Sequence, residues 1–251
     1  MEPAQTAQPG TLYLVGTPLG NLADLTFRAR SILETVDIIA CEDTRRSLSL
    51  LSHYGIRKPL LSLHEHNEAA RTQQLLAALQ EGKSAALISD AGMPLISDPG
   101  QRLLHAIRLA QVPYEVIPGP SAPIVALVGS GLPATEFYFG GFLPVKSGQR
   151  QRALEEALAK EHTSAFFESP HRLLGTLEKL AQLAPGRMIC VARELTKKFE
   201  EFHTATAAEC WAHYQQKSVK GEITLVIAGA TLPRWMSAPR AAEEDARRPP
   251  H

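Results

Sequence analysis

Short apolar runs alternate with amphipathic helical patterns along most of this chain, and the alternation restricts the folds open to it. In the first half, the apolar runs have the length of buried strands and lie at 11–16, 37–42, 59–63, 84–89 and 114–118. Helical patterns lie at 24–36, 44–55, 67–82, 101–111 and 121–131. Continuously apolar strands separated by helices predict an α/β fold with a mostly parallel sheet covered on both faces.

The alternation resumes after a segment rich in Gly and Pro at 129–137, which is a candidate domain boundary. Strands are expected at 137–142, 163–169, 188–194, 198–206 and 221–229, and helices at 149–161, 170–184 and 207–217. Because more strands follow one another directly here, the second sheet is predicted to be mixed. The expected organisation is a flexible leader (1–10), an N-terminal α/β domain (11–131), a C-terminal α/β domain (132–230) and a flexible tail (231–251).

Composition narrows the compartment and the partners. The 26 Lys and Arg balance 26 Asp and Glu, so any contact with nucleic acid would depend on local basic groups. Cys41, Cys190 and Cys210 form no CxxC pair, which argues against a zinc site and fits a reducing compartment. No apolar run reaches the roughly 18 residues of a membrane span, and the N-terminal residues lack a secretory signal pattern. A cytoplasmic location without membrane association is expected.

Three loops that follow predicted strands are rich in Gly, Pro and small residues: GTPLGN (16–21), SDAGMPLISDPG (89–100) and PGPSA (118–122). In open α/β sheets ligands bind where strands end, and small residues there let a ligand approach the backbone. The loops contain neither a GxGxxG fingerprint nor a P-loop, yet together they indicate a nucleotide-like cofactor. Asp90 is the candidate ligand residue of the second loop, whereas Asp98, just before Pro99, has the pattern of a helix N-cap.

Three further strand ends carry charged and polar side chains, in the stretches CEDTRR (41–46), HEHNE (64–68) and FFESPHR (166–172). In the first, Asp43 is either an N-cap beside solvated arginines or part of an ion-pair network that orients a polar substrate. In the second, His64 and His66 could bind a metal with further ligands, but no partner motif supports such a site and no metal is expected. In the third, Arg172 is either a phosphate contact or a surface helix residue.

From about Gly10 to Gly229 the chain resembles the small-subunit ribosomal RNA methyltransferase I group of the tetrapyrrole-methylase superfamily. The resemblance rests on stretches that occur in this order: GTPLGNLADLTFRA, CEDTRRS, HEHNE, SDAGMPLISDPG, PGPSAPIVAL, FFESPHRL, RELTKKFEE and GEITLVI. It implies a class III methyltransferase-like homodimer whose subunit has two α/β/α domains, with S-adenosylmethionine in the cleft between them. It also implies 2′-O-methylation of a cytidine ribose in the decoding region of 16S rRNA.

The resemblance also implies candidate site residues. Met93 stands where the superfamily's second loop has an aspartate, so the neighbouring Asp90 is expected to make the ribose contact instead. The implied cofactor-binding residues are Leu19, Asp90, Ala91, Gly92, Met93, Ile96, Ser121, Ala122, Glu168 and Leu195. Arg45, Asn67, Ser169 and Arg172 at the charged strand ends are the candidate RNA-binding residues, because they could position the sugar and its phosphates.

A ribose hydroxyl is a weak nucleophile, so the enzyme would have to align it with the methyl group and help remove its proton. Candidate bases are, in order of preference, Glu42, Asp43 and His66. The low net charge suggests an assembled small ribosomal subunit rather than free rRNA as the substrate. Two alternatives stay open: a methyltransferase for a tetrapyrrole, against which the charged strand ends argue, and a non-catalytic RNA- or ribosome-binding module, against which the intact cofactor loops argue.

Overall fold

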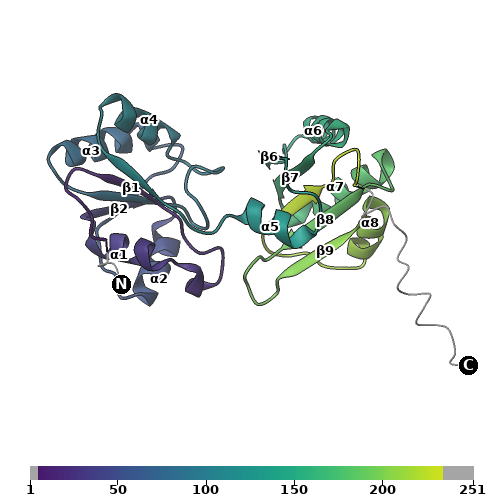
Figure 1. Cartoon of the computed structure of the whole chain (residues 1–251), viewed down its shortest axis with the longest axis horizontal. Coiled ribbons are helices and arrows are strands. Elements are labelled where there is room, and N and C mark those ends of the chain that lie inside the picture. Colours follow the sequence, from purple (N-terminus) through teal and green to yellow (C-terminus); the bar gives the residue numbers. More distant parts are fainter. Residues whose placement is uncertain (1–4, 234–251) are drawn as a thin grey trace, which may run out of the picture. The chain divides into compact units, whose positions relative to one another are not determined.

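The computed structural model describes residues 5–233, which form two compact units (Figure 1). The first contains the residues up to Val125 together with Glu194–Glu200, and the second contains Ala126–Arg193 and the residues from Glu201 onward. The division falls within helix α5 (Ala122–Ser130). The connection between strands β8 (Met188–Arg193) and β9 (Glu201–Thr206) therefore belongs to the first unit, although both strands lie in the second.

The first unit is built on a parallel sheet with the strand order β3-β2-β4-β1-β5. Its strands are β1 (Leu12–Val15), β2 (Ile38–Cys41), β3 (Leu60–Ser62), β4 (Ala85–Ile88) and β5 (Tyr114–Ile117). The connecting elements are the 3-10 helix η1 (Leu22–Asp24) and the helices α1 (Phe27–Thr35), α2 (Thr44–His53), α3 (Glu68–Gln80) and α4 (Gln101–Leu109). The parallel α/β sheet predicted for the first half is thus confirmed.

Helices cover both faces of this sheet because successive strand residues point to opposite sides. Tyr13 and Val15 of β1 join a core with α1 and α2, whereas Leu12 and Leu14 join a core with α3 and α4. Figure 1 shows the two helix pairs on the two sides of the sheet. Because all five strands are parallel, their carboxyl ends lie at one edge of the sheet, where the predicted cofactor loops follow them.

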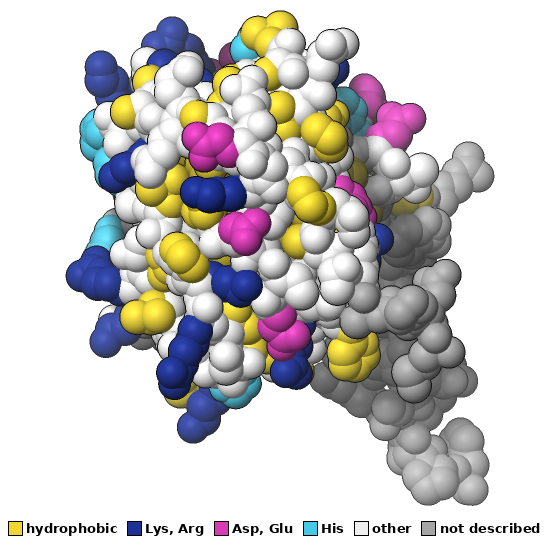
Figure 2. All heavy atoms as spheres, turned by 90° about the vertical axis from the view of Figure 1, so that its left-hand side faces the viewer, with side chains coloured by type: hydrophobic (Ala, Val, Ile, Leu, Met, Phe, Trp, Pro, Cys, Tyr) yellow, Lys and Arg dark blue, Asp and Glu magenta, His cyan; other side chains and the backbone are white. Residues whose placement is uncertain are grey.

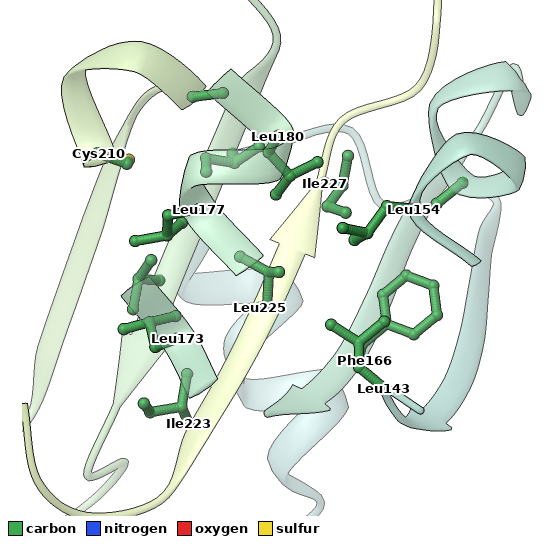
Figure 3. Close-up of a cluster of buried hydrophobic side chains, with 14 of the residues drawn as sticks. Leu143, Leu154, Phe166, Leu173, Leu177, Leu180, Cys210, Ile223, Leu225 and Ile227 are labelled. Carbon is green, nitrogen blue, oxygen red and sulfur yellow. The ribbon is translucent and has the colours of Figure 1, made fainter. Parts of the chain in front are cut away.

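The second unit contains the mixed sheet expected from the sequence, in the order β6-β7-β10-β8-β9. Strands β6 (Phe137–Phe142) and β7 (Thr163–Glu168) pair in parallel, and the other pairings, including those of β10 (Ile223–Ile227), are antiparallel. The helices are α6 (Ser147–Ala159), α7 (Pro170–Leu183) and α8 (Ala207–Gln215). Figure 3 shows how Leu173, Leu177 and Leu180 of α7 pack into the buried apolar core with Leu225 of β10.

Residues 5–8, near the start of the described region, contact the first unit. Residues expected to form a flexible leader make hydrogen bonds with the first unit: the Gln5 amide nitrogen donates to Glu115 over 2.7 Å, and the Gln8 N–H donates to the Tyr13 hydroxyl over 2.9 Å. Most of the expected tail, residues 234–251, lies outside the described residues. No helix of the described part is both long and apolar enough to span a bilayer.

One predicted helix cap is wrong. Helix α4 begins at Gln101 with Gly100 in the N-cap position, so Asp98 does not cap it. The buried carboxylate of Glu68 does so from α3, because its Oε1 accepts hydrogen bonds of 2.9 Å from the N–H groups of both Gly100 and Arg102. The carboxylate replaces the local cap and opposes the positive end of the helix dipole.

Two histidines stack in the second unit, and they make its stability depend on pH. The rings of His203 and His213 lie 4.0 Å apart at 11°. Burial and the neighbouring His213 lower the pKa of His203. Lys217 adds to this effect, whereas Glu201 opposes it. Because the unfolded chain binds this proton more readily than the folded chain, folding stability is full above the ordinary pKa of 6.5 and is lost as the pH falls through it.

We therefore expect the free energy of unfolding of the second unit to decrease between about pH 7.5 and about pH 5.5. Denaturant unfolding at both pH values measures the effect. The variant His203→Gln should show a smaller decrease, since its side chain does not titrate. An equal decrease in the variant and the wild type would show that other groups are responsible.

Candidate active site

The loops after β1 and β4 are joined at the carboxyl edge of the first sheet. Thr17 and Gly92 exchange two backbone hydrogen bonds, of 2.9 and 3.0 Å, in an isolated antiparallel bridge. The buried Thr17 hydroxyl donates to the Ser89 carbonyl over 3.2 Å. These bonds satisfy main-chain groups that would otherwise be orphaned where the strands end, and they hold the two loops in one position.

The loop after β5 meets the other two, with no space for a side chain at the meeting point. A Cβ atom placed on Gly16 would lie 2.7 Å from the Gly119 Cα and 2.7 Å from the Met93 sulfur. Leu19 is buried, and its side chain lies next to Gly92. The structure thus brings the candidate residues Leu19, Gly92 and Met93 together where the loops after β1, β4 and β5 pack closely against one another.

Further predicted cofactor positions belong to the loops after β4 and β5. Ala91, Ser121 and Ala122 are half-buried, whereas Ile96 has 44% of its surface exposed. The residues on either side of Ile96 adopt left-handed backbone conformations, with φ of 71° at Leu95 and 69° at Ser97. Such conformations are unfavourable for these residue types, so the surrounding structure must hold the loop in place.

A further segment that lies on the first loop is Glu194–Glu200. The Asn21 N–H donates to the Thr196 hydroxyl over 3.0 Å, and a Cβ atom on Gly20 would collide with the Lys197 side chain. Leu195, the predicted cofactor contact, is buried. Thr196 and Lys197 were not predicted as site residues. Positive φ values at Glu194 (51°) and Thr196 (63°) shape the segment. Glutamate and threonine rarely adopt such values, so the sequence does not indicate this conformation.

The CEDTRR stretch places its charges beside the second loop. Asp43 is the N-cap of α2, as predicted, and accepts from the Arg45 N–H over 2.8 Å and from its guanidinium over 3.1 Å. These hydrogen bonds from Arg45 lower the pKa of Asp43. Asp90 accepts from the Asp43 N–H over 3.3 Å and pairs with Arg46 over 3.2 Å. Asp90 is therefore tied to α2.

Two carboxyl groups at this edge hold protons more tightly than usual. Partial desolvation and the charge of Asp90 raise the pKa of Glu42, against the opposing effects of Arg46 and His64. Burial, then the charges of Glu42 and Asp90, raise the pKa of Asp98 to about 7. A raised carboxyl pKa near neutrality is typical of groups that transfer protons.

The HEHNE stretch forms a hydrogen-bonded turn after β3. Asn67 occupies the N-cap position of α3 but makes no capping bond; its side chain instead accepts from the His64 N–H over 2.9 Å and donates to the Ser62 carbonyl over 3.1 Å. His66 is exposed, with its ring 5.9 Å from that of His64. Across the described residues, no group of three or more His, Cys, Asp or Glu has the arrangement of a metal site.

In the second unit, Glu168 of the FFESPHR stretch makes its hydrogen bonds with the following residues of the chain. The Glu168 side chain is fully buried and accepts from the Arg172 guanidinium (2.9 Å), the Ser169 N–H (2.7 Å) and the Thr176 hydroxyl (2.6 Å). Ser169 caps α7. The Glu168 carboxylate is thus occupied by α7, and only the main chain at this position is available for the predicted cofactor contact.

Comparison with known proteins identifies the family of this site. The family model of the tetrapyrrole (corrin/porphyrin) methylases matches residues 11–210. This chain belongs to the tetrapyrrole methylase family. The methylase is 50% identical over 223 residues to "Ribosomal RNA small subunit methyltransferase I" of Synechocystis sp., covering 88% of this chain and 80% of that protein. It is 45% identical over 221 residues to the protein of the same name from Thermotoga maritima, covering 88% and 99%.

Solved structures show the same fold at low sequence identity. The methylase resembles the uroporphyrin-III-C-methyltransferase of Thermus thermophilus with a TM-score of 0.63 and 23% identity, over 89% of this chain and 99% of the other. It resembles a diphthine synthase with a TM-score of 0.67 and 14% identity, over 89% and 92%. The methylase is therefore an enzyme of the methyltransferase class with the class III fold.

Proposed function

We propose that this methylase transfers the methyl group of S-adenosylmethionine to the 2′-hydroxyl of a cytidine ribose in the decoding region of 16S rRNA. The single observation that carries the proposal is its similarity, at 45–50% identity over 88% of the chain, to relatives named for small-subunit ribosomal RNA methylation. The charged strand ends CEDTRR and HEHNE fit a polar acceptor better than an apolar tetrapyrrole.

The first unit offers a fitting cradle for the cofactor. The loops after β1, β4 and β5 approach one another closely at Gly16, Gly92 and Gly119, and N–H and C=O groups of loops that meet at a strand-end edge can bind the polar parts of a ligand. Leu19 and Met93 pack at this meeting point, Ala91, Ser121 and Ala122 belong to the same loops, and Asp90 is tied to α2. When bound, S-adenosylmethionine supplies a methyl group on a sulfonium, an electrophile that needs alignment rather than activation.

The basic side chains of α2 are suited to rRNA. The side chains of Arg45 and Arg46 are 91% and 65% exposed, so both can contact phosphates while they pair with Asp43 and Asp90. Figure 2 shows Lys and Arg side chains gathered along one edge of the face that it presents, despite the zero net charge. We place Asn67, Ser169 and Arg172 among the RNA contacts as well. Binding should weaken steeply with salt.

Among the three bases expected from the sequence, the environment favours Glu42. Its raised pKa makes it a stronger base than an ordinary glutamate, whereas Asp43 has a lowered pKa and is held by Arg45. His66 is exposed and lies beyond His64. The enzyme acts in the cytoplasm as a homodimer, on the assembled small ribosomal subunit.

The test is incubation of the purified protein with tritiated S-adenosylmethionine and small ribosomal subunits that lack the modification, followed by digestion and mass spectrometry. We expect label on the 2′-oxygen of one cytidine. Label only on a tetrapyrrole would support a small-molecule methyltransferase instead. Binding to subunits without cofactor binding or transfer would indicate a non-catalytic module.

A further inference from the structure

Two polar groups at the carboxyl edge of the first sheet have no protein partner among the described residues. One is the carboxylate of Asp98, which is half-buried and makes no hydrogen bond or ion pair there. The other is the buried Nδ1 of His64. Leaving a buried donor or acceptor such as the His64 nitrogen unpaired costs free energy, and a carboxylate without a protein partner at the same strand-end edge is open to a ligand.

The protonation of His64 follows from its neighbour. The Asn67 amide is oriented by the Ser62 carbonyl and the His64 N–H, and its nitrogen lies 3.0 Å from the His64 Nε2. An amide nitrogen donates, so Nε2 accepts and the neutral ring carries its proton on Nδ1. The unpartnered Nδ1 of His64 is therefore a hydrogen-bond donor.

The main chain holds Asp98 in place without using its side chain. Leu95 and Ser97 before it have positive φ, and Glu68 binds the N–H of Gly100 just after it. Because Glu68 caps α4, the Asp98 carboxylate is left free for another role.

Burial and the surrounding charges distinguish Asp98 from Glu42. Asp90 and Glu42 both act on Asp98, and Asp90 has Arg46 as its partner. At Glu42 the charge of Arg46 acts against the effects of burial and Asp90, and Glu65 adds to those effects. No cation among the described residues lowers the pKa of Asp98. Arg102, four residues further on, forms an ion pair with Glu68 instead. Its proton affinity therefore matches that of a general base working near neutrality.

Resting on the proposed 2′-O-methylation, we propose that the Asp98 carboxylate accepts the proton of the ribose hydroxyl, with the His64 Nδ1–H as a donor at the same edge. The oxygen–methyl bond forms while the carbon–sulfur bond breaks, and that electron pair returns to sulfur, leaving a neutral thioether. The hydroxyl proton goes to the Asp98 carboxylate, and from this half-buried group it passes to water. Glu42 then acts as a positioning residue that raises the basicity of Asp98.

The test compares Asp98→Asn with wild type, after methyl transfer by the wild type has been established. Asparagine keeps the shape and can donate, but it cannot take a proton. We expect kcat to fall about 100-fold to 1000-fold, with the affinity for S-adenosylmethionine unchanged within about twofold. Asp98→Glu should restore part of the activity. Glu81→Gln, an exposed carboxyl after α3 at the opposite edge of the sheet, is the matched control and should keep full activity.

The pH profile gives a second, independent readout. Because the pKa of Asp98 is about 7, wild-type kcat should rise with pH through that value. In Glu42→Gln one repelling charge is gone, so the rise should move to lower pH. Asp98→Asn that keeps at least a third of kcat, or that loses cofactor affinity in proportion to turnover, would overturn the proposal. Loss of kcat in Glu42→Gln with an active Asp98→Asn would assign the base to Glu42. A wild type without transfer would instead refute the proposed function.

Discussion

Replacement of Glu168 by alanine should lower the free energy of unfolding of the second unit by about 3–5 kcal/mol. The side chain is fully buried and is the shared acceptor of the Arg172 guanidinium, the Ser169 N–H and the Thr176 hydroxyl. Its removal leaves a largely buried cation and two further donors without a partner, which costs more than the lost interactions themselves. Denaturant unfolding followed by circular dichroism measures the change.

Glu178→Gln is the matched control for this prediction, because Glu178 is exposed on the same helix and should change stability by less than about 0.5 kcal/mol. Glu168→Gln keeps the shape but leaves Arg172 without its counter-charge, so its effect should lie between the two. An alanine variant as stable as the control would show that Arg172 and Thr176 find other partners. The Glu168 carboxylate would then be available as a ligand contact.

The sequence predicts elements and caps well where their causes are local. Apolar runs and helical periodicity predicted the parallel sheet and the mixed sheet, because the buried face of a strand or helix is formed by residues at regular spacing within that element. The N-cap interpretation of Asp43, one of the two left open, could be made because a cap bonds N–H groups two or three residues away, as Asp43 does with Arg45. The loops that carry Leu19, Gly92 and Met93 lie together because parallel strands all end at one edge of the sheet.

Features that depend on distant residues could not be read in the same way. Asp98 has the pattern of a cap, but Glu68, separated by 32 positions from Gly100, takes that role. The segment Glu194–Glu200 lies on the first loop because of backbone conformations at Glu194 and Thr196 that no residue type announces. The unpartnered Nδ1 of His64 depends on the direction of the Asn67 amide, which only the folded turn determines.

Gly16→Ala should reduce kcat/KM by at least about 100-fold and weaken the binding of S-adenosylmethionine. The new Cβ would lie 2.7 Å from the Gly119 Cα and 2.7 Å from the Met93 sulfur. Met93 can rotate away, but the backbone of Gly119 cannot, so the loops after β1 and β5 must separate. Misplacement of this size disturbs the alignment on which methyl transfer depends. Calorimetric titration with the cofactor and steady-state kinetics measure the two effects.

The control for Gly16→Ala is Gly175→Ala, since a Cβ at Gly175 of α7 meets no neighbouring atom. An added methyl group there favours the helix, so this variant should be as active as the wild type and slightly more stable. If Gly16→Ala is folded and binds the cofactor as the wild type does, the cradle formed by the three loops is not where the cofactor lies. If it loses binding while Gly175→Ala does not, the close approach of the loops at this strand end is required for cofactor binding, because the two variants add the same atom and differ only in what that atom meets.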